Sequence, residues 1–462
     1  MAGDGKVSKE LGATLVRKVT YPLWTMRNHP RYRHYVRLFE RSQWLSADEL
    51  DHLQLRLLRA QLIHAYSNVP FYRRGMEKAK ITPLDIQTRD DLRLLPVLTK
   101  REIQEHAEEL LATNFPADRR GVNQTGGSTG TPLQFCVDHE RSDSRRASTD
   151  RHNEWAGLRP GDWLAVLWGS TYEMGTASIP KITWRHWLFD RSLALNTSLV
   201  SVEDLENFIA LLRRYRPRRL KAYAQAAAMF ARYCLETGAD DIHFDSIITS
   251  AEVLLPENRA LIEEAFGGKV FNRYGCREVS VIATECEYHT GLHMNADALL
   301  VEIEPVAGGP EGLGRILVTD LYNRSMPLIR YEIGDLARWV DDAPCPCGRA
   351  LPRLAGVEGR ITDFLLMPDR RMISGPSLAL LVGQTPGVRQ AQFVQTGPEE
   401  IRLDVIPGES YGSHTVDDLC RRLYPYFRDQ VRFSVRCVES IASELSGKFR
   451  FVKTEYDRAK AF

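Results

Sequence analysis

The sequence has few cysteines, no long apolar run and almost no net charge. Eight cysteines in 462 residues are too sparse for a disulfide scaffold, so thiols or metal ligands in a reducing compartment are expected. No stretch approaches the roughly 18 apolar residues of a membrane helix, and the N-terminus lacks the apolar core of a secretory signal. A balance of 61 basic against 60 acidic residues does not favour nucleic acid as a partner. We expect a cytoplasmic protein without membrane insertion.

Length and periodicity predict an α/β protein of two domains. Residues 1–112 show apolar residues at spacings of three and four, with Ser46 as a helix cap, and are expected to be mainly helical. Beyond residue 120, short strand-like runs such as "DWLAVLWG", "DSIITSA" and "KVFNRYG" alternate with helical runs such as "VEDLENFIALLRRY", which favours mixed sheets with parallel strands. A strand, strand, helix, strand order near the end predicts a small α+β domain. The predicted domains are residues 1–360 and 361–462.

A loop rich in glycine and hydroxyl residues, "NQTGGSTGTPL" at 123–133, has the composition of a phosphate cradle. It lacks the lysine of a Walker A loop, because Thr131 and Pro132 follow Gly130. It also lacks the Gly-x-Gly-x-x-Gly spacing of a dinucleotide fingerprint. By itself the loop is compatible with an ordinary linker.

The loop is the first of six segments whose order along the chain is informative. The others are "SAEVLLPE" (250–257), "FNRYGCREV" (271–279), "RYEIGDLARW" (330–339), "GRITDFLL" (359–366) and "SGKFRFVK" (446–453). Together they resemble the core motifs of the adenylate-forming superfamily, which includes acyl-CoA synthetases, adenylation domains and luciferases. The likeness extends to the phenylacetate-CoA ligase branch and its capsule-biosynthesis relatives, through "SNVPFYRRGMEKAKITPL" and "CPCGR".

The resemblance implies a ligase that uses ATP and Mg²⁺ to convert a carboxylic acid into an acyl-adenylate, which a thiol or an amine then intercepts. The implied nucleotide-binding residues are Thr125, Gly126, Gly127, Ser128, Thr129 and Gly130 for the phosphates, and Ala251, Glu252, Asn272, Tyr274, Gly275, Asp335 and Arg360 around the adenosine. Tyr274 would stack on adenine, Asn272 would bind its amino edge, and Asp335 would accept both ribose hydroxyls. Glu278 would hold the magnesium ion.

The resemblance also implies a source for the cation that the loop lacks. Lys448 lies where the family keeps a catalytic lysine, on a small mobile domain that rotates about a hinge, here Asp363. One position departs from the family pattern: Arg277 stands where the family usually has threonine. Arg277 is expected either to contact the AMP phosphate, as a catalytic residue, or to pair with a nearby carboxylate.

Cysteine and histidine residues of two segments indicate a structural zinc site. The branch carries a similar site, and the matching residues are Cys286, His293, Cys345 and Cys347. His289 is an alternative ligand, and unligated cysteines in a turn are the plain alternative to a metal.

The acid and the acceptor are less defined. Trp168, Tyr172 and Met174 follow or end a predicted strand and are expected either to line a pocket for an aryl or compact acid or to pack in the core. The basic stretch "RRYRPRRLK" is compatible with the phosphates of coenzyme A or with a solvated helix end, and "RYRHYVR" with a solvated face or a partner contact. Coenzyme A is the expected acceptor. An amine, a carrier-protein thiol, a homodimer, and a zinc-stabilised binding protein without catalysis remain alternatives.

Overall fold

The computed structural model of the chain describes residues 12–124, 133–168, 186–197, 200–306, 310–340, 343–360, 364–369, 372–374, 385–441 and 450–456, with positions 179, 183, 378 and 382. By internal contacts the chain divides into two compact units. Unit 1 comprises Met1–Glu302, Leu317–Ile333 and Trp339–Ala355, and unit 2 comprises Ile303–Ile316, Gly334–Arg338 and Gly356–Phe462. The predicted domain boundary at residue 360 stays a prediction.

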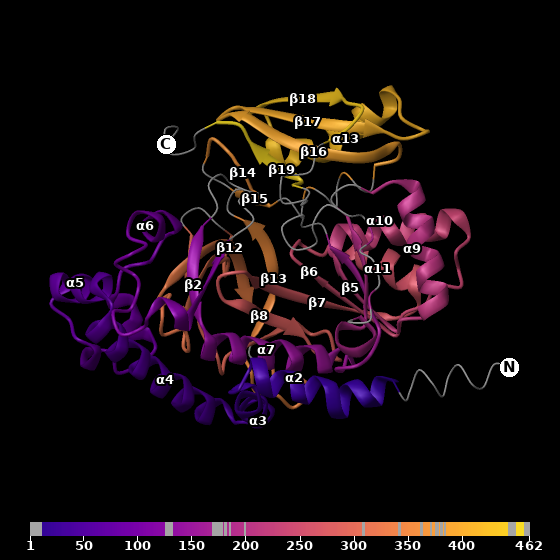
Figure 1. The fold of residues 1–462 in the computed structure, drawn as a ribbon. Coiled ribbons are helices and arrows are strands. Elements are labelled where there is room, and N and C mark those ends of the chain that lie inside the picture. Colours follow the sequence, from indigo (N-terminus) through magenta and orange to yellow (C-terminus); the bar gives the residue numbers. More distant parts are fainter. Residues whose placement is uncertain are drawn as a thin grey trace. The chain divides into compact units, whose positions relative to one another are not determined.

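Unit 1 begins with a series of helices, as the sequence predicted (Figure 1). They are η1 (Val16–Thr20), α2 (Tyr21–Asn28), α3 (Tyr32–Ser42), α4 (Ala47–Asn68), α5 (Pro70–Ala79) and α6 (Lys100–Glu105), with short 3-10 turns η2 (Pro83–Asp85), η3 (Asp90–Leu94) and η4 (Ala117–Arg119). Ser46 caps α4 as expected: its Oγ accepts from the Glu49 backbone N–H at 3.3 Å, and Glu49 Oε2 accepts from the Ser46 N–H at 2.9 Å. Among the described residues, no helix is long and apolar enough to cross a membrane.

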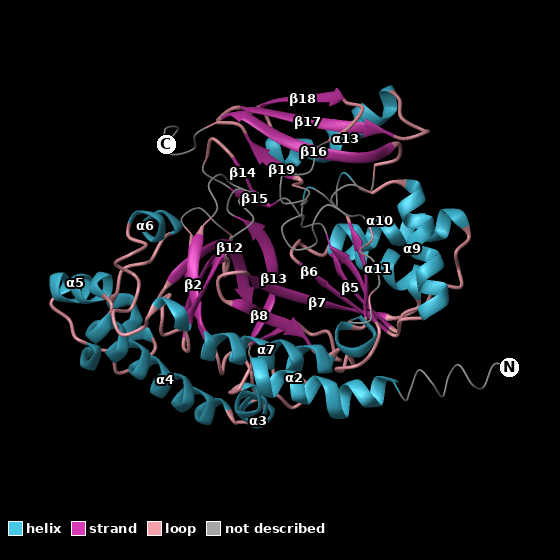
Figure 2. Cartoon of the chain, in the orientation of Figure 1, coloured by secondary structure: helices cyan, strands magenta, loops and turns pink. Residues whose placement is uncertain are grey.

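The strands confirm the expected α/β class with a mixed sheet (Figure 2). The strand order is β10-β11-β12-β13-β9-β8-β7-β6-β5-β3-β4, and a separate hairpin joins β1 to β2. The bounds are β1 (Arg120–Gln124), β2 (Gln134–Asp138), β3 (Leu164–Trp168), β4 (Ser192–Asn196), β5 (Arg219–Tyr223), β6 (Ser246–Ser250), β7 (Lys269–Cys276), β8 (Ser280–Glu285), β9 (Leu292–Met294), β10 (Leu299–Pro305), β11 (Gly314–Asp320), β12 (Tyr331–Trp339) and β13 (Arg353–Arg360). Strands β4, β3, β5, β6 and β7 run parallel, and β8 returns antiparallel to β7.

Helices α9 (Val202–Tyr215), α10 (Ala224–Thr237) and α11 (Pro256–Phe266) follow strands β4, β5 and β6 and pack with them around one apolar core. The core includes Leu167, Phe208, Phe230, Ile247 and Val270, which are all fully or almost fully buried. Parallel strands with helical crossovers place the carboxyl ends of β5, β6 and β7 at one edge of the sheet. Ligands of open α/β sheets bind at such an edge. The π-helical turn η5 (His186–Asp190) precedes β4.

Unit 2 contains the predicted strand, strand, helix, strand order. The sheet β18-β17-β16-β19 is formed by β16 (Val388–Gly397), β17 (Glu400–Pro407), β18 (Arg432–Cys437) and β19 (Val452–Thr454), and α13 (Ser413–Phe427) lies between β17 and β18 in the chain. Two features of unit 2 were not predicted from the sequence: β19, and the hairpin of β14 (Phe364–Leu366) and β15 (Met372–Ser374). Each of these strands has three residues, too few to show an alternating pattern.

The helix α7 (His139–Trp155) buries charged residues instead of an apolar stripe. The Nε of Arg141 donates to Asp320 Oδ2 at 2.7 Å, and neither side chain has exposed surface. The same guanidinium donates to the carbonyl of Val279 at 3.1 Å. Asp320 also accepts from the N–H groups of Tyr322 and Asn323. The pair is therefore surrounded by the hydrogen bonds that a buried ion pair requires.

Replacing Arg141 with methionine should lower the free energy of unfolding by about 3–5 kcal/mol, because Asp320 would remain as a buried, unpaired charge. The measurement is the urea midpoint of the purified variant. The double variant Arg141→Met/Asp320→Asn should recover part of the loss. Arg213→Met, which removes an exposed ion pair with Asp241, should change the midpoint little. An unchanged midpoint for Arg141→Met would contradict this account.

Candidate functional site

The predicted adenine-binding residues lie at the carboxyl edge of the parallel strands. Asn272 and Tyr274 belong to β7, and the pairing of Thr249 with Asn272 places them beside the end of β6, where Ala251 and Glu252 follow. Asn272 and Tyr274 are half-buried. The structure thus brings four of the predicted residues to one edge of the sheet.

Glycine is required at position 275 by a close approach of two strands. A β-carbon there would lie 2.5 Å from the carbonyl oxygen of Ser280, closer than atoms pack. The antiparallel pairing of β7 with β8 shifts by one residue between Tyr274 and Gly275. This irregularity leads into a tight turn at residues 277–279, which carries Glu278.

Two arginines of α7 hold the backbone of that turn. Arg145 donates to the carbonyl oxygens of Arg277, at 3.2 Å, and of Glu278, while Arg141 takes the carbonyl of Val279. Burial lowers the pKa of Arg145 to about 10, so it is still a cation at neutral pH. Each carbonyl group of the turn therefore accepts a hydrogen bond from a charged donor. These bonds fix the backbone of the turn and so the direction of the Glu278 side chain.

The Glu278 side chain is itself buried and is held by one hydroxyl group. Tyr331 Oη donates to Glu278 Oε1 at 2.8 Å, and Tyr331 is almost completely buried. The carboxylate keeps Oε2 as a further acceptor. A hard oxygen donor in a fixed position, next to the proposed adenine residues, suits a magnesium ion with its own waters and phosphate ligands.

The departure at Arg277 has a contact that the sequence did not predict. Its Nη1 donates to the carbonyl of Gln124 at 3.0 Å. Gln124 ends β1 and directly precedes residues 125–130, the part of the glycine-rich loop that is expected to bind phosphates. Arg277 therefore ties the Glu278 turn to the start of this loop. Whether it also contacts a nucleotide phosphate stays a prediction.

Ala251 and Glu252 form a second fixed turn. Ala251 has a φ of +70°, a left-handed conformation that costs a residue with a β-carbon about 1–2 kcal/mol. Glu252 Oε2 accepts from the backbone N–H of Gln225 at 2.9 Å, in the first turn of α10. The positive end of the α10 dipole and this hydrogen bond favour the carboxylate there.

Trp168 ends β3 and is half-buried. Its ring packs against Tyr223 with centroids 4.4 Å apart, and Lys221 Nζ lies 5.0 Å from its centroid. Trp168 contacts the core of unit 1 and lies at the carboxyl edge of the sheet, so both sequence interpretations stay open.

The remaining predicted residues are placed as follows. Thr125, Gly126, Gly127, Ser128, Thr129, Gly130, Tyr172, Met174, Asp363 and Lys448, and the side chain of Arg360, lie outside the described residues. Asp335 is half-buried in β12, in unit 2, directly after Gly334 with a φ of +91°.

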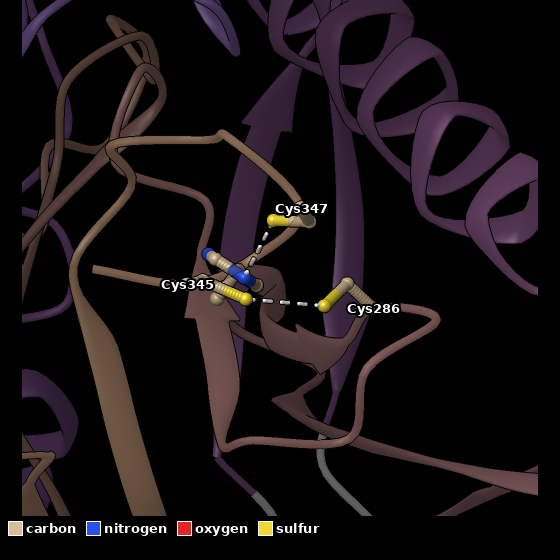
Figure 3. Close-up of side chains that lie close together, drawn as sticks. Cys286, Cys345 and Cys347 are labelled. Atoms are coloured by element: carbon tan, nitrogen blue, oxygen red, sulfur yellow. Dashed lines mark hydrogen bonds between the residues drawn. The ribbon is translucent and has the colours of Figure 1, made fainter. Parts of the chain in front are cut away.

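The four predicted zinc ligands come together in unit 1. The ligand atoms of Cys286, His293, Cys345 and Cys347 all lie within 4.8 Å of one another. Cys286 Sγ and Cys345 Sγ are 3.6 Å apart, and Cys347 Sγ is 3.4 Å from His293 Nε2. Figure 3 shows the labelled cysteines with their sulfur atoms turned towards a shared space. These separations suit a tetrahedral site, in which Zn–S bonds of about 2.3 Å place sulfur atoms about 3.8 Å apart.

The groups around the cluster favour a metal over free thiols. The Nδ1–H of His293 points to the carbonyl of Leu351 at 3.2 Å, which leaves Nε2 for the metal. The backbone N–H groups of Tyr288 and Arg349 point to Cys286 Sγ and Cys347 Sγ, each at 3.5 Å.

Burial keeps the histidine of this cluster neutral, as a metal ligand must be. It lowers the pKa of His293 to about 4. Burial also raises the pKa of the Cys286 thiol to about 12. A bound dication would stabilise the thiolate form. The alternative ligand His289 instead has its Nδ1 3.1 Å from Glu285 Oε2.

Comparisons with known proteins show what the chain is similar to in sequence and in fold. Residues 365–455 match the model of the CapK C-terminal domain. The chain is 28% identical to phenylacetate-coenzyme A ligase of Thermus thermophilus over 70% of this chain and 73% of that protein, and 24% identical to Protein CapK of Staphylococcus aureus over 91% and 92%. A crystal structure of 2-hydroxyisobutyryl-CoA ligase in the postadenylation state superimposes with a TM-score of 0.72, at 24% identity, over 91% of this chain and 92% of that one.

The chain shares the fold of this CoA ligase. Its relatives are phenylacetate-coenzyme A ligases and CapK, as the motif order predicted. The contacts around Glu278 also involve residues that the sequence did not single out. Tyr331 and Arg145 lie far from the turn in sequence, and neither belongs to a motif that marks it as a partner of Glu278. Tyr331 is part of the "RYEIGDLARW" segment, but its contact with Glu278 was not predicted.

Proposed function

We propose that the chain is an ATP-dependent, AMP-forming acid ligase that activates an aryl or compact carboxylic acid as an acyl-adenylate and transfers the acyl group to coenzyme A. The observation that carries the proposal is the Glu278 turn, with its carboxylate held by Tyr331 and its backbone held by Arg141 and Arg145 beside Asn272 and Tyr274. Relatives named phenylacetate-coenzyme A ligase support the same chemistry.

In the first half-reaction an acid carboxylate oxygen attacks the α-phosphorus of ATP, and pyrophosphate leaves. The backbone and hydroxyl groups of residues 125–130 would bind the β and γ phosphates, and Glu278 would hold Mg²⁺. Tyr274 and Asn272 would bind the adenine, and Asp335 with Arg360 the ribose. Because Arg277 contacts the residue before the loop, its role would include positioning that loop.

In the second half-reaction the thiol of coenzyme A attacks the acyl carbonyl carbon, its proton is released, and AMP leaves. Lys448 would act only in the first half-reaction, where its ammonium group neutralises charge between the acid and the α-phosphate. A hinge at Asp363 would then withdraw it with the C-terminal domain. Trp168, Tyr172 and Met174 would bound the acyl pocket. The cytoplasmic location is part of the same proposal.

The direct test is acid-dependent release of pyrophosphate from ATP, across a panel of aryl and short carboxylic acids. We expect release with a subset of acids and a thioester product when coenzyme A is added. Glu278→Gln should reduce the rate at least about a hundredfold, since one charged metal ligand is lost. Glu264→Gln, at an exposed position of α11, is the matched control and should keep the rate.

Two outcomes would change this conclusion. If no acid releases pyrophosphate from folded, metal-replete protein, the enzyme proposal is wrong and a non-catalytic binding protein remains. If pyrophosphate is released but coenzyme A gives no thioester, the acceptor is an amine or a carrier-protein thiol, and product analysis with those acceptors identifies it.

Lys448→Ala should abolish adenylate formation while leaving intact the conversion of a supplied acyl-adenylate to the thioester. The reason is that the ammonium charge is needed only while negative charge develops on the transferring phosphate oxygens. The two half-reactions are measured separately, by pyrophosphate release and by thioester formation from synthetic adenylate. Lys453→Ala, on β19, is the control for a lost lysine nearby. Equal losses in both half-reactions would refute the assignment.

We further propose that the Cys286, His293, Cys345 and Cys347 cluster holds a structural zinc ion. Four protein ligands leave no open position for a water or substrate, so the ion would supply stability and not catalysis. It would join the turn after β8 to the turn at residues 345–347, and so fix the segment between β12 and β13.

Protein purified from cells grown with added zinc should contain about one zinc ion per chain by elemental analysis. His293→Ala and Cys347→Ser should lose the metal and melt at lower temperature. His289→Ala and Cys420→Ser should keep it, because His289 pairs with Glu285 and Cys420 is exposed on α13. Full zinc content in His293→Ala would show that the ligand set is wrong.

A further inference from the structure

The N-terminal helix of unit 1 has one face held against the protein and one face without a described partner. Residues 12–28 are continuously helical through η1 and α2. On the inner face, the Tyr21 hydroxyl donates to Asp150 of α7 at 2.5 Å, and Thr20 Oγ1 donates to the carbonyl of Leu188 at 2.7 Å. Arg17 pairs with Asp162 at 2.9 Å. These contacts fix which face of the helix points outwards.

The outward face carries a stripe of large apolar side chains. Leu15, Val19, Leu23 and Met26 are 46%, 43%, 61% and 54% exposed. Their spacings of four, four and three residues place them in a row along one side of the helix. Such a row on a protein surface marks an interaction site, whereas single exposed apolar residues do not.

Basic residues lie beside the stripe and on the next helix of the chain. Residues 12–42 contain seven lysines and arginines and a single acid, Glu40, although the whole chain has a net charge of only +1. Lys18 and Arg27 flank the stripe, and Arg33, Arg37 and Arg41 follow at spacings of four along α3, all of them exposed. Among the described parts of the chain, these five side chains have no ion-pair partner.

Two acids of α7 next to this region, Asp143 and Asp150, are turned inwards and already accept hydrogen bonds, whereas Glu40 and Glu140 are exposed. Asp143 accepts from the backbone N–H of Arg31 and lies 2.7 Å from His29 Nδ1, while Asp150 accepts from Tyr21 and Tyr32. They therefore do not neutralise the outer surface. Helices α2 and α3 contact each other, and Figure 1 shows them along the same outer edge of unit 1.

The positive charge of the basic residues distinguishes between the partners that could bind the apolar stripe. A second copy of the chain would bring two basic surfaces together, and like charges oppose that contact. An anionic lipid surface complements both features at once, because acyl chains accept the aliphatic side chains while headgroups attract the lysines and arginines. A helix that projects a row of aliphatic side chains suits the flat, deformable surface of a lipid bilayer.

We propose that residues 12–42, here called the basic ridge, bind the surface of an anionic phospholipid bilayer. The ridge lies in the interface with Leu15, Val19, Leu23 and Met26 among the headgroups, and no helix of the described residues is long and apolar enough to cross the membrane. This binding is independent of the proposed ligase activity. It would place the enzyme next to acids or acceptors that are themselves associated with lipid.

The test is flotation of the full-length protein with phosphatidylcholine vesicles, pure or containing about one third phosphatidylglycerol. The wild type should float with the anionic vesicles at low salt, float less at high salt, and stay in solution with pure phosphatidylcholine. Leu23→Glu/Met26→Glu and Arg33→Gln/Arg37→Gln should each weaken binding by about tenfold or more, since each removes buried apolar area or two attracted charges.

Matched controls change the same chemistry elsewhere on unit 1. Leu84→Glu alters a leucine that is 78% exposed on η2, and Arg93→Gln/Arg232→Gln removes two exposed charges outside the ridge. Both controls should bind as the wild type does, and all variants should keep pyrophosphate release in solution. Failure of the ligase assay would leave the flotation result unaffected.

Three results would overturn the proposal. If the wild type does not float with anionic vesicles at low salt, the ridge does not bind a bilayer, and an acidic protein partner becomes the better occupant. If the controls lose as much binding as the ridge variants, the attraction is not localised. If Leu23→Glu/Met26→Glu converts a dimer to a monomer by light scattering while vesicle binding is absent, the stripe is an interface between copies.

Discussion

Arg141 and Asp320 form an ion pair with no exposed surface, and the geometry of the candidate site depends on it. A guanidinium in the interior must be surrounded by acceptors, because water is not there to solvate it. Arg141 finds them in Asp320, in Ser144 and in the carbonyl of Val279. The last of these is part of the turn that carries Glu278. The hydrogen bonds that the buried Arg141 guanidinium requires thus hold the Glu278 turn in place.

The same helix, α7, organises a second region through charges of the opposite sign. Arg141 and Arg145 contact the Glu278 turn, whereas Asp143 and Asp150 accept from the N-terminal helices. One helix therefore connects the positions of the candidate site and of the basic ridge, with polar contacts on both sides. Hydrogen bonds and ion pairs require specific distances and angles. The contacts of α7 therefore position the N-terminal helices and the Glu278 turn more precisely than packing of an apolar stripe would.

Elements with a regular spacing of apolar residues were predicted from the sequence. Elements that are stabilised by contacts with residues distant in the sequence were missed. The helical run of α9 and the cap at Ser46 were predicted from local pattern, and the cluster of Cys286, His293, Cys345 and Cys347 was predicted from the resemblance. The burial of α7 could not be predicted, because "HERSDSRRASTDRHNEW" contains no apolar stripe and its partners are more than a hundred residues away.

Single residues of the candidate site show the same limit. Glu278 was identified from its motif, but the hydroxyl of Tyr331 that holds it depends on tertiary structure. Arg277 was expected near a phosphate or a carboxylate, and its described contact is a backbone carbonyl. Local sequence thus predicted which residue types gather here, while the hydrogen bonds that orient them depend on segments brought together by folding.

Ala251 has a consequence for how this protein can vary. Its left-handed backbone is held in place by the neighbouring contact between Glu252 and the start of α10. In this conformation the cost rises steeply for β-branched side chains and disappears for glycine. The backbone conformation of this turn therefore limits which substitutions position 251 tolerates. Glycine, alanine and asparagine can adopt it, whereas valine and isoleucine cannot adopt it without strain.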